Sequence, residues 1–156
     1  MNENNNARTL KIVIGSDHAG YPLKEEVTSS LKDDGFEITD IGTYSLESVD
    51  YPDIAVKAAS AVAEGEFDRG ILICGTGIGM SITANKVDGI RAAATSDTFS
   101  ARMARMHNNA NVLCMGARVV GPGLAHEIAK NFLETDFEAG SRHERRVNKM
   151  NALDEC

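Results

Sequence analysis

Residues 70–81, GILICGTGIGMS, join a short apolar run to a glycine-rich turn and the start of another segment. The run from Gly70 to Cys74 has the length and the apolar character of a buried strand. Three glycines follow at alternate positions, and residues 78–86 then have the pattern of a helix. The order of strand, tight turn and helix is the repeating unit of an α/β protein.

The same alternation extends in both directions along the chain. Apolar runs predict strands over residues 10–15, 36–42, 70–74, 90–96 and 111–120. Amphipathic segments predict helices from about Pro22 and over residues 52–65, 78–86, 97–108 and 121–134, with a last short helix around Arg146. Five strands that alternate with helices indicate a parallel sheet covered on both faces, which is a three-layer α/β sandwich.

Topology rules give this sheet an expected strand order. Right-handed crossovers with a single reversal predict the flavodoxin/Rossmann-like order 2-1-3-4-5. Ligands of such sheets bind outside the carboxyl ends of the strands, at the point where the order reverses, here between the first and third strands. The loops that follow these two strands are GSDHAG (15–20) and CGTGIG (74–79). We therefore expect both loops to line one binding site.

The length of 156 residues favours one domain. We expect that domain to span residues 10–156, with a C-terminal helical tail from about residue 135. The polar leader at residues 1–9 is expected to be disordered.

Composition excludes several classes of protein. A formal net charge of −7 argues against general binding to nucleic acid. No apolar run approaches the roughly 20 residues of a membrane span, and the first ten residues lack the apolar core of a signal peptide. Three cysteines without paired spacing suit free thiols in a reducing compartment. We expect a cytoplasmic protein without nucleic-acid or membrane partners.

The glycine loop resembles no common nucleotide motif. Met80 stands where a dinucleotide fingerprint requires its last glycine, and no Gly-Lys-Ser/Thr sequence follows. Glycines at a helix start still allow backbone N–H groups to face an anion, although tight packing alone would explain them equally well. The same N–H groups would stabilise a thiolate at Cys74. The alternative is a small buried hydrophobe, which is the role we assign to Cys114.

Other polar residues are candidates for binding. Asp17 and His18 follow the first strand, where they favour recognition of sugar hydroxyls and phosphate. His107 precedes the fifth strand and is a further candidate for binding. The alternative is that it only caps the C-terminal end of a helix. Arg142 and Arg146 are four residues apart on the last predicted helix, where they can hold one phosphate.

Several motifs together resemble a known family. They are GSDHAGYPLKEEV, DYPDIA, ILICGTGIGMSITANK, IRAA, MHNNANVLCMGARVVG and RHERRV, and they cover Leu10 to about Val147 in order. The combination is similar to the type B ribose-5-phosphate isomerases, which share ancestry with the subunits of galactose-6-phosphate isomerase.

The resemblance implies roles for individual residues. Cys74 matches the proton acceptor and His107 the proton donor that assists ring opening. Another branch of the family has a glutamate at the position of Met80, and because methionine cannot accept a proton, the base here should be Cys74. Substrate-binding positions are matched by Asp17, His18, Gly75, Thr76, Gly77, Ile78, Gly79, Asn108, Arg118, Arg142 and Arg146.

The expected reaction interconverts ribose 5-phosphate and ribulose 5-phosphate in the pentose phosphate pathway. One base moves a proton between C2 and C1 through an enediolate, which requires no metal and no organic cofactor. Backbone N–H groups of residues 75–79 would hold the negative oxygen, with the Thr76 hydroxyl beside them. His107 can protonate the ring oxygen near neutral pH.

Chain topology also predicts how the site is assembled. His107 ends a helix of about 11 residues, roughly 16 Å long, that precedes the fifth strand. His107 is therefore expected at the amino ends of the strands, far from Cys74. We therefore expect a homodimer, or a tetramer built from it, in which a partner supplies the histidine to a shared site. The chain that contributes each arginine stays open. Two alternatives remain: an isomerase of six-carbon sugar phosphates, and a non-catalytic module that binds a sugar phosphate.

Overall fold

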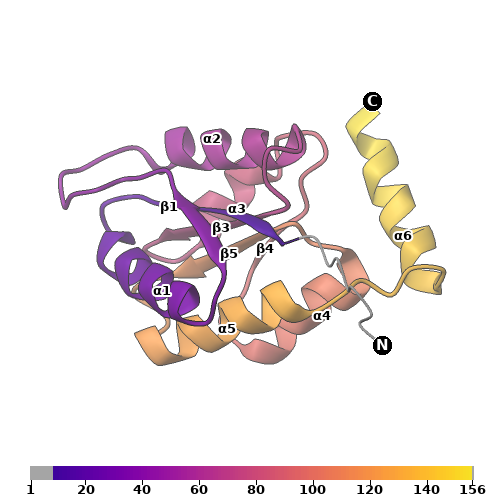
Figure 1. Ribbon diagram of the computed structural model, residues 1–156. Helices are drawn as coiled ribbons and strands as arrows, with labels where there is room; N and C mark the ends of the chain where they lie inside the picture. Colours follow the sequence, from indigo (N-terminus) through magenta and orange to yellow (C-terminus); the bar gives the residue numbers. More distant parts are fainter. Residues whose placement is uncertain (1–8, 156) are drawn as a thin grey trace.

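A computed structural model describes residues 9–155 as a five-stranded, fully parallel sheet between two layers of helices (Figure 1). The predicted three-layer α/β class is therefore confirmed. Apart from Thr9, the leader predicted to be disordered lies outside the described residues. No helix among residues 9–155 is long and apolar enough to cross a bilayer.

The chain alternates between the two kinds of element, as its sequence pattern predicted. The strands are β1 (Lys11–Ser16), β2 (Glu37–Asp40), β3 (Arg69–Cys74), β4 (Ala92–Ala94) and β5 (Val112–Gly116). The helices are α1 (Tyr21–Asp33), α2 (Tyr51–Ala63), α3 (Ile78–Ala84), α4 (Thr98–Asn108), α5 (Pro122–Glu134) and α6 (Arg142–Asn151), followed by the short 3-10 helix η1 (Ala152–Glu155).

Side chains of the central strands alternate between two cores. Ile71 and Ile73 of β3 point into the core formed with α1, α4 and α5, whereas Leu72 and Cys74 point into the core formed with α2 and α3. Successive side chains of a strand face opposite sides of the sheet, so a run that is apolar at every position needs helices on both sides. This requirement explains the three layers.

The observed strand order is β2-β1-β3-β5-β4, so the predicted 2-1-3-4-5 was wrong for the last two strands. All five residues of β5 are buried, whereas β4 is a short run of three alanines that are only partly buried or exposed. The longer apolar strand gains more from a position covered on both faces, and the short strand is suited to an edge. A right-handed return from β4 to β5 then places α4 beside α5, as Figure 1 shows.

The predicted switch point between β1 and β3 is confirmed. The N–H of Asp17, just after β1, donates to the carbonyl of Ile73 near the end of β3 at 3.2 Å. A Cβ on Gly20 would lie 2.3 Å from the same carbonyl oxygen, so the two loops meet where only a glycine fits.

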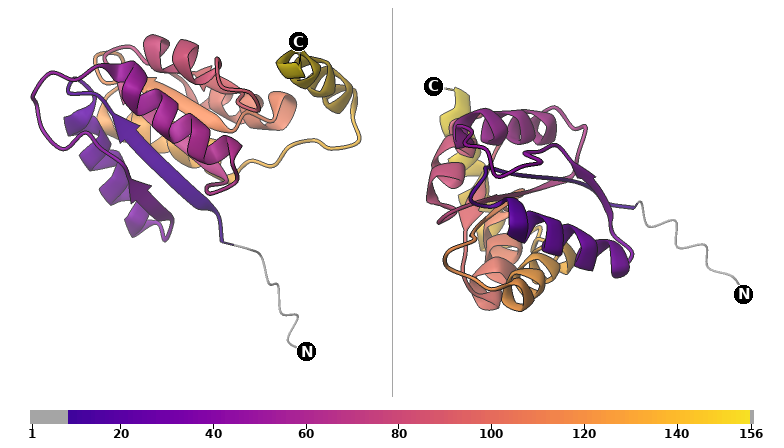
Figure 2. Two further views of the ribbon diagram at one scale, coloured as in Figure 1. Left: turned by 90° about the horizontal axis from the view of Figure 1, so that it is seen from above. Right: turned by 90° about the vertical axis from the view of Figure 1, so that its left-hand side faces the viewer.

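The predicted C-terminal helical tail is also present. Helix α6 contacts α4 and stands to one side of the sheet, after a connecting segment that runs away from the end of α5 (Figure 2). It lies at the edge where the amino ends of the strands are found (Figure 1). The tail therefore lies at the edge opposite to the glycine loop.

Candidate active site

Cys74 is the last residue of β3, and its thiol is held by the glycine loop. The N–H of Gly77 donates to the Sγ of Cys74 at 3.0 Å, and only 5% of the residue is exposed. An N–H donor aimed at sulfur stabilises the thiolate more than the thiol, because the charged acceptor makes the stronger hydrogen bond. The structure therefore supports the predicted pairing of thiol and glycine turn.

Gly77 adopts a conformation that other residues rarely take. Its φ is +82°, and a Cβ on it would lie 2.9 Å from the carbonyl carbon of Met115. Next to it, the hydroxyl of Thr76 accepts a hydrogen bond from the N–H of Ile78 at 3.3 Å. Thr76 and Ile78 are exposed, so the loop is tight on its inner side and open on its outer side.

Arg118 lies against the same loop in the same chain. Its N–H donates to the carbonyl of Gly75 at 3.0 Å, and a Cβ on Gly75 would come within 2.9 Å of its Nη1. A side chain at position 75 would displace the Arg118 guanidinium, so the observed position of Arg118 depends on a glycine at position 75. Arg118 thus lies beside the glycine loop that follows Cys74 in its own chain.

Asp17 and His18 complete this end of the sheet. Asp17 is 6% exposed, and its carboxylate accepts the N–H of Gly20 at 2.9 Å, which closes the turn after β1. His18 is half-buried, and its Nδ1 accepts the N–H of Val49 at 3.2 Å, which leaves Nε2 as the protonated nitrogen of the neutral ring. His18 can therefore donate from Nε2 to a ligand oxygen.

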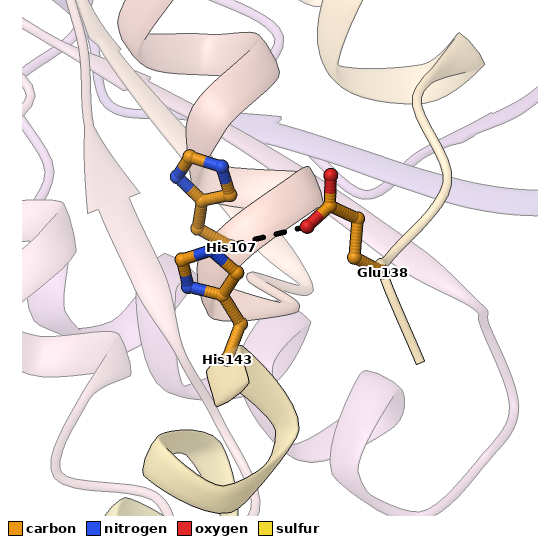
Figure 3. A group of neighbouring side chains, drawn as sticks. All are labelled: His107, Glu138 and His143. Atoms are coloured by element: carbon orange, nitrogen blue, oxygen red, sulfur yellow. Dashed lines mark ion pairs between the residues drawn. The ribbon is translucent and has the colours of Figure 1, made fainter. Parts of the chain in front are cut away.

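A second group of residues gathers around His107, in the last turn of α4. Figure 3 shows His107 with Glu138 and His143, two neighbours that were not predicted as site residues. The His107 ring stacks on that of His143 from α6, with centroids 4.0 Å apart and planes 10° from parallel. The Nε2 of His143 lies 3.8 Å from a carboxylate oxygen of Glu138. Burial, followed by the nearby His107, lowers the pKa of His143. A neutral ring is thereby favoured in the stack.

Arg142 and Arg146 belong to this second group. Both are exposed on α6, and both add positive charge that lowers the pKa of His143 further. Asn108 is exposed beside His107 at the end of α4. One chain therefore carries a histidine, an asparagine and two arginines on one surface.

The two groups lie at opposite edges of the sheet. Cys74 pairs in register with Gly116 at the carboxyl end of β5, whereas Gly70 pairs with Val112 at its amino end. Four steps along β5 span about 13 Å, and His107 lies beyond the amino end. The structure thus brings Cys74, the glycine loop, Asp17, His18 and Arg118 together, and His107, Asn108, Arg142 and Arg146 together, but not the two sets within one chain.

Two neighbours of the site were missed by sequence reasoning. Tyr51 packs over the glycine loop, because a Cβ on Gly79 would lie 2.6 Å from its ring. His143 lies within the RHERRV motif, but nothing in its spacing indicated a stack on His107. Both contacts join residues that are far apart in the chain, so periodicity carried no signal for them.

Comparison with known proteins gives a consistent result. The profile of the family described as Ribose/Galactose Isomerase matches residues 12–150. Ribose-5-phosphate isomerase B of Escherichia coli is 49% identical over 145 residues, which cover 93% of this chain and 97% of that protein. D-erythrulose-4-phosphate isomerase of Pectobacterium atrosepticum is 50% identical over 135 residues, 84% of this chain and 87% of that one.

A solved structure also shares the fold. The structure described as Clostridium thermocellum ribose-5-phosphate isomerase B superposes with a TM-score of 0.90 at 53% sequence identity. The match covers 94% of this chain and 98% of that one.

Proposed function

This chain belongs to the family of ribose and galactose isomerases, and within it we propose that the protein interconverts ribose 5-phosphate and ribulose 5-phosphate. The observation that carries the proposal is the 3.0 Å hydrogen bond from the Gly77 N–H to the thiol of Cys74. It prepares a base at the end of a strand, beside a loop whose backbone can accept the charge that the base creates.

The chemistry follows from that arrangement. The Cys74 thiolate takes the proton from C2 of the open aldose, and the electron pair forms the C1–C2 double bond as the carbonyl oxygen becomes negative. Backbone N–H groups of residues 75–79 hold that oxygen, apart from those of Gly77 and Ile78, which donate to Cys74 and Thr76. A proton passes from the hydroxyl on C2 to the oxygen on C1, the thiol returns its proton to C1, and the C2 oxygen becomes that of the ketone. Both half-reactions use one base, and the proton count balances without a redox partner.

His107 serves as the acid that opens the sugar ring, and a partner chain brings it to the thiol. The separation of the two residue groups supports this assignment, because each group lacks what the other holds. Apolar side chains are exposed near the glycine loop and the β4 edge, which suits a contact with a second copy: they are Ile78, Ile82, Phe99 and Val119. In the resulting homodimer, each site takes the thiol from one chain and the histidine from the other.

The phosphate would be held by Arg142 and Arg146, which lie on the same surface as His107 and so come from the same chain. Two guanidinium groups one helical turn apart present several N–H donors to a phosphate dianion. Arg118 would approach from the chain that supplies Cys74. The cytoplasmic location expected from the free cysteines stays a prediction.

The substrate has two competing assignments. The relative from Pectobacterium atrosepticum is named for D-erythrulose 4-phosphate, which is one carbon shorter than ribulose 5-phosphate. Six-carbon sugar phosphates were the enzymatic alternative that the sequence left open. All these substrates share the reacting carbons and the phosphate, so the same residues would act on each of them.

The test is an isomerase assay with Cys74→Ala and the matched variant Cys114→Ala, run with chelator present against four-, five- and six-carbon sugar phosphates. We expect ribose 5-phosphate to give the highest kcat/KM. Cys74→Ala should lose at least the roughly 10²–10⁴-fold that a positioned base contributes while still binding the sugar phosphate. Near-normal turnover of Cys74→Ala would refute the role of the thiol, and binding without turnover in the wild type would favour a binding module.

A further inference from the structure

The residues around His107 form a second kind of site. His107, Glu138 and His143 each offer one ligand atom, and these atoms all lie within 4.8 Å of one another (Figure 3). Two imidazoles and one carboxylate are a donor set that zinc uses in proteins. The three residues come from the end of α4, from the segment between α5 and α6, and from the first turn of α6.

Hydrogen bonds to backbone groups fix these three segments to one another. The N–H of Glu138 donates to the carbonyl of Met106, next to His107, at 3.1 Å. The hydroxyl of Ser141 donates to the carbonyl of Glu138 at 2.6 Å and accepts the N–H of His143 at 3.1 Å. The backbone at each of the three positions is therefore tied to its neighbour, so that their side chains converge without a rearrangement of the fold.

We propose that His107, Glu138 and His143 bind one Zn²⁺ ion, or a divalent transition ion of similar preference, and that the ion inhibits the enzyme. Zn–N and Zn–O bonds of about 2.0–2.2 Å require ligand atoms roughly 3.3 Å apart in a tetrahedral site. The present atoms need to approach by about 1.5 Å at most. Side-chain rotation can supply that movement, because Glu138 is 49% exposed.

The stacked rings must also turn. The lone pair of an imidazole nitrogen lies in the ring plane, and two planes only 10° from parallel cannot both contain one ion. Rotation of the His143 ring about its Cβ–Cγ bond tilts its plane, so that the planes of both rings can pass through the ion. This torsion has a broad energy minimum. Because the Glu138 side chain is half exposed, water can supply a fourth ligand.

The neighbouring charges determine which ions can bind. Arg142 and Arg146 place positive charge near His143 and oppose any cation. Mg²⁺ and Ca²⁺ depend on several charged oxygen ligands, of which the cluster offers one, so these ions should not bind. Zn²⁺, Cu²⁺ and Ni²⁺ bind neutral imidazole strongly enough to tolerate the arginines.

Inhibition follows from the identity of the ligands. A metal-bound His107 nitrogen cannot carry the proton that opens the sugar ring, and the ion would stand where the sugar must approach. This consequence rests on the proposed isomerase function, whereas metal binding itself does not. The two parts can therefore fail separately.

The test measures Zn²⁺ binding by titration calorimetry in phosphate-free buffer with the wild type, His143→Gln, Glu138→Gln, Cys74→Ala and the matched control His126→Gln. His126 is a half-buried histidine on α5 that pairs with Asp34, outside the cluster. We expect one Zn²⁺ per chain in the wild type and in the control. Each ligand variant should bind Zn²⁺ at least roughly 10–100-fold more weakly than the wild type. Replacement of a residue that only supports a metal ligand already costs that much affinity.

Isomerase rates at controlled free Zn²⁺ give the second arm, with each variant compared with its own metal-free rate. We expect the inhibitory Zn²⁺ concentration to rise in parallel with the dissociation constant, and Mg²⁺ to have no effect. Equal Zn²⁺ affinity in the wild type and in both ligand variants would overturn the site. Loss of binding in Cys74→Ala with retention in His143→Gln would assign the ion to the thiol and also overturn it. Binding at the cluster without inhibition would refute the regulatory part alone.

Discussion

Lys24 and Asp40 form an ion pair under the loop that joins β2 to α2. The Nζ of Lys24 lies 2.6 Å and 2.7 Å from the two carboxylate oxygens of Asp40, and it also donates to the carbonyl of Thr43 at 2.7 Å. None of the Lys24 side chain is exposed. The same loop pairs with Ser16 through Gly42 and Thr43. The ion pair therefore holds a loop that contacts the end of β1, next to the candidate residues Asp17 and His18.

Replacing Lys24 should destabilise the protein strongly. Lys24→Met leaves the Asp40 carboxylate without its partner, and removal of one member of a buried pair costs about 3–5 kcal/mol. We expect the lower end of that range, because 21% of the Asp40 side chain is exposed. The matched control is Lys130→Met, since Lys130 is 41% exposed and lies 3.7 Å from Asp34. Its loss should stay below about 1 kcal/mol. Urea unfolding of both variants measures the difference, and similar losses would contradict the assignment.

The Lys24 contact also shows where sequence reasoning stopped. A lysine within an amphipathic helix is expected at the surface, and its carboxylate partner is 16 residues away at the end of another element. By contrast, the apolar runs of β1 and β3 and their glycine turns made both the sheet and the meeting of the loops after these two strands predictable. Those features are local and follow general topology rules.

The order of β4 and β5 and the second residue group show the same limit. The sequence indicated that both strands exist, but their order depends on how much apolar surface each can bury beside β3. The separation of His107 from Cys74 could be predicted, because it depends on the direction of parallel strands. The stack of His107 on His143 could not, because it depends on how the tail folds back onto α4.

Gly77 should be the glycine of the loop that tolerates substitution least. Gly77→Ala combines a left-handed backbone with a Cβ 2.9 Å from the backbone of Met115. Gly65 is the matched control, because its φ is also +82° and nothing lies within 4 Å of an added Cβ. Gly65→Ala should cost about 1–2 kcal/mol for the conformation alone.

We expect Gly77→Ala to lower the free energy of unfolding more than Gly65→Ala does. It should also lower kcat, because movement of the loop away from Met115 displaces the N–H that donates to Cys74. Unfolding curves and steady-state kinetics on both variants provide the measurement. An equal stability loss in the two variants would mean that the loop relaxes away from Met115. A normal kcat in Gly77→Ala would show that the hydrogen bond to the thiol is dispensable.

Cys114 should make the protein sensitive to alkali. Burial, with a smaller contribution from Cys74, raises the pKa of the Cys114 thiol above its ordinary value. The unfolded chain then releases this proton above about pH 8.5, whereas the folded chain keeps it. The contribution to stability is complete below that pH and falls by about 1.4 kcal/mol per pH unit above it.

Unfolding of the wild type and Cys114→Ala at pH 7 and pH 10 tests this dependence. At pH 7 the variant should be less stable by about 1 kcal/mol, because the alanine leaves a small void. At pH 10 the difference should shift by about 2 kcal/mol in favour of the variant, since it has no thiol to titrate. Parallel pH profiles for the two proteins would show that Cys114 does not titrate differently in the folded state.

The separation of Cys74 from His107 gives a test of shared sites by complementation. If each site combines Cys74 of one chain with His107 of the other, neither Cys74→Ala nor His107→Ala homodimers contain a complete site. Mixed dimers contain one site with both lesions and one with neither. Equal amounts and random pairing make about half of the dimers mixed, and half of their sites are intact, so about a quarter of wild-type activity should return.

Subunit exchange is followed with two affinity tags, and a mixture of Cys74→Ala with a Cys74→Ala, His107→Ala double variant serves as the control that should stay inactive. Sites built within one chain would leave every site of every mixture incomplete, so demonstrated exchange without recovery of activity would refute the shared site.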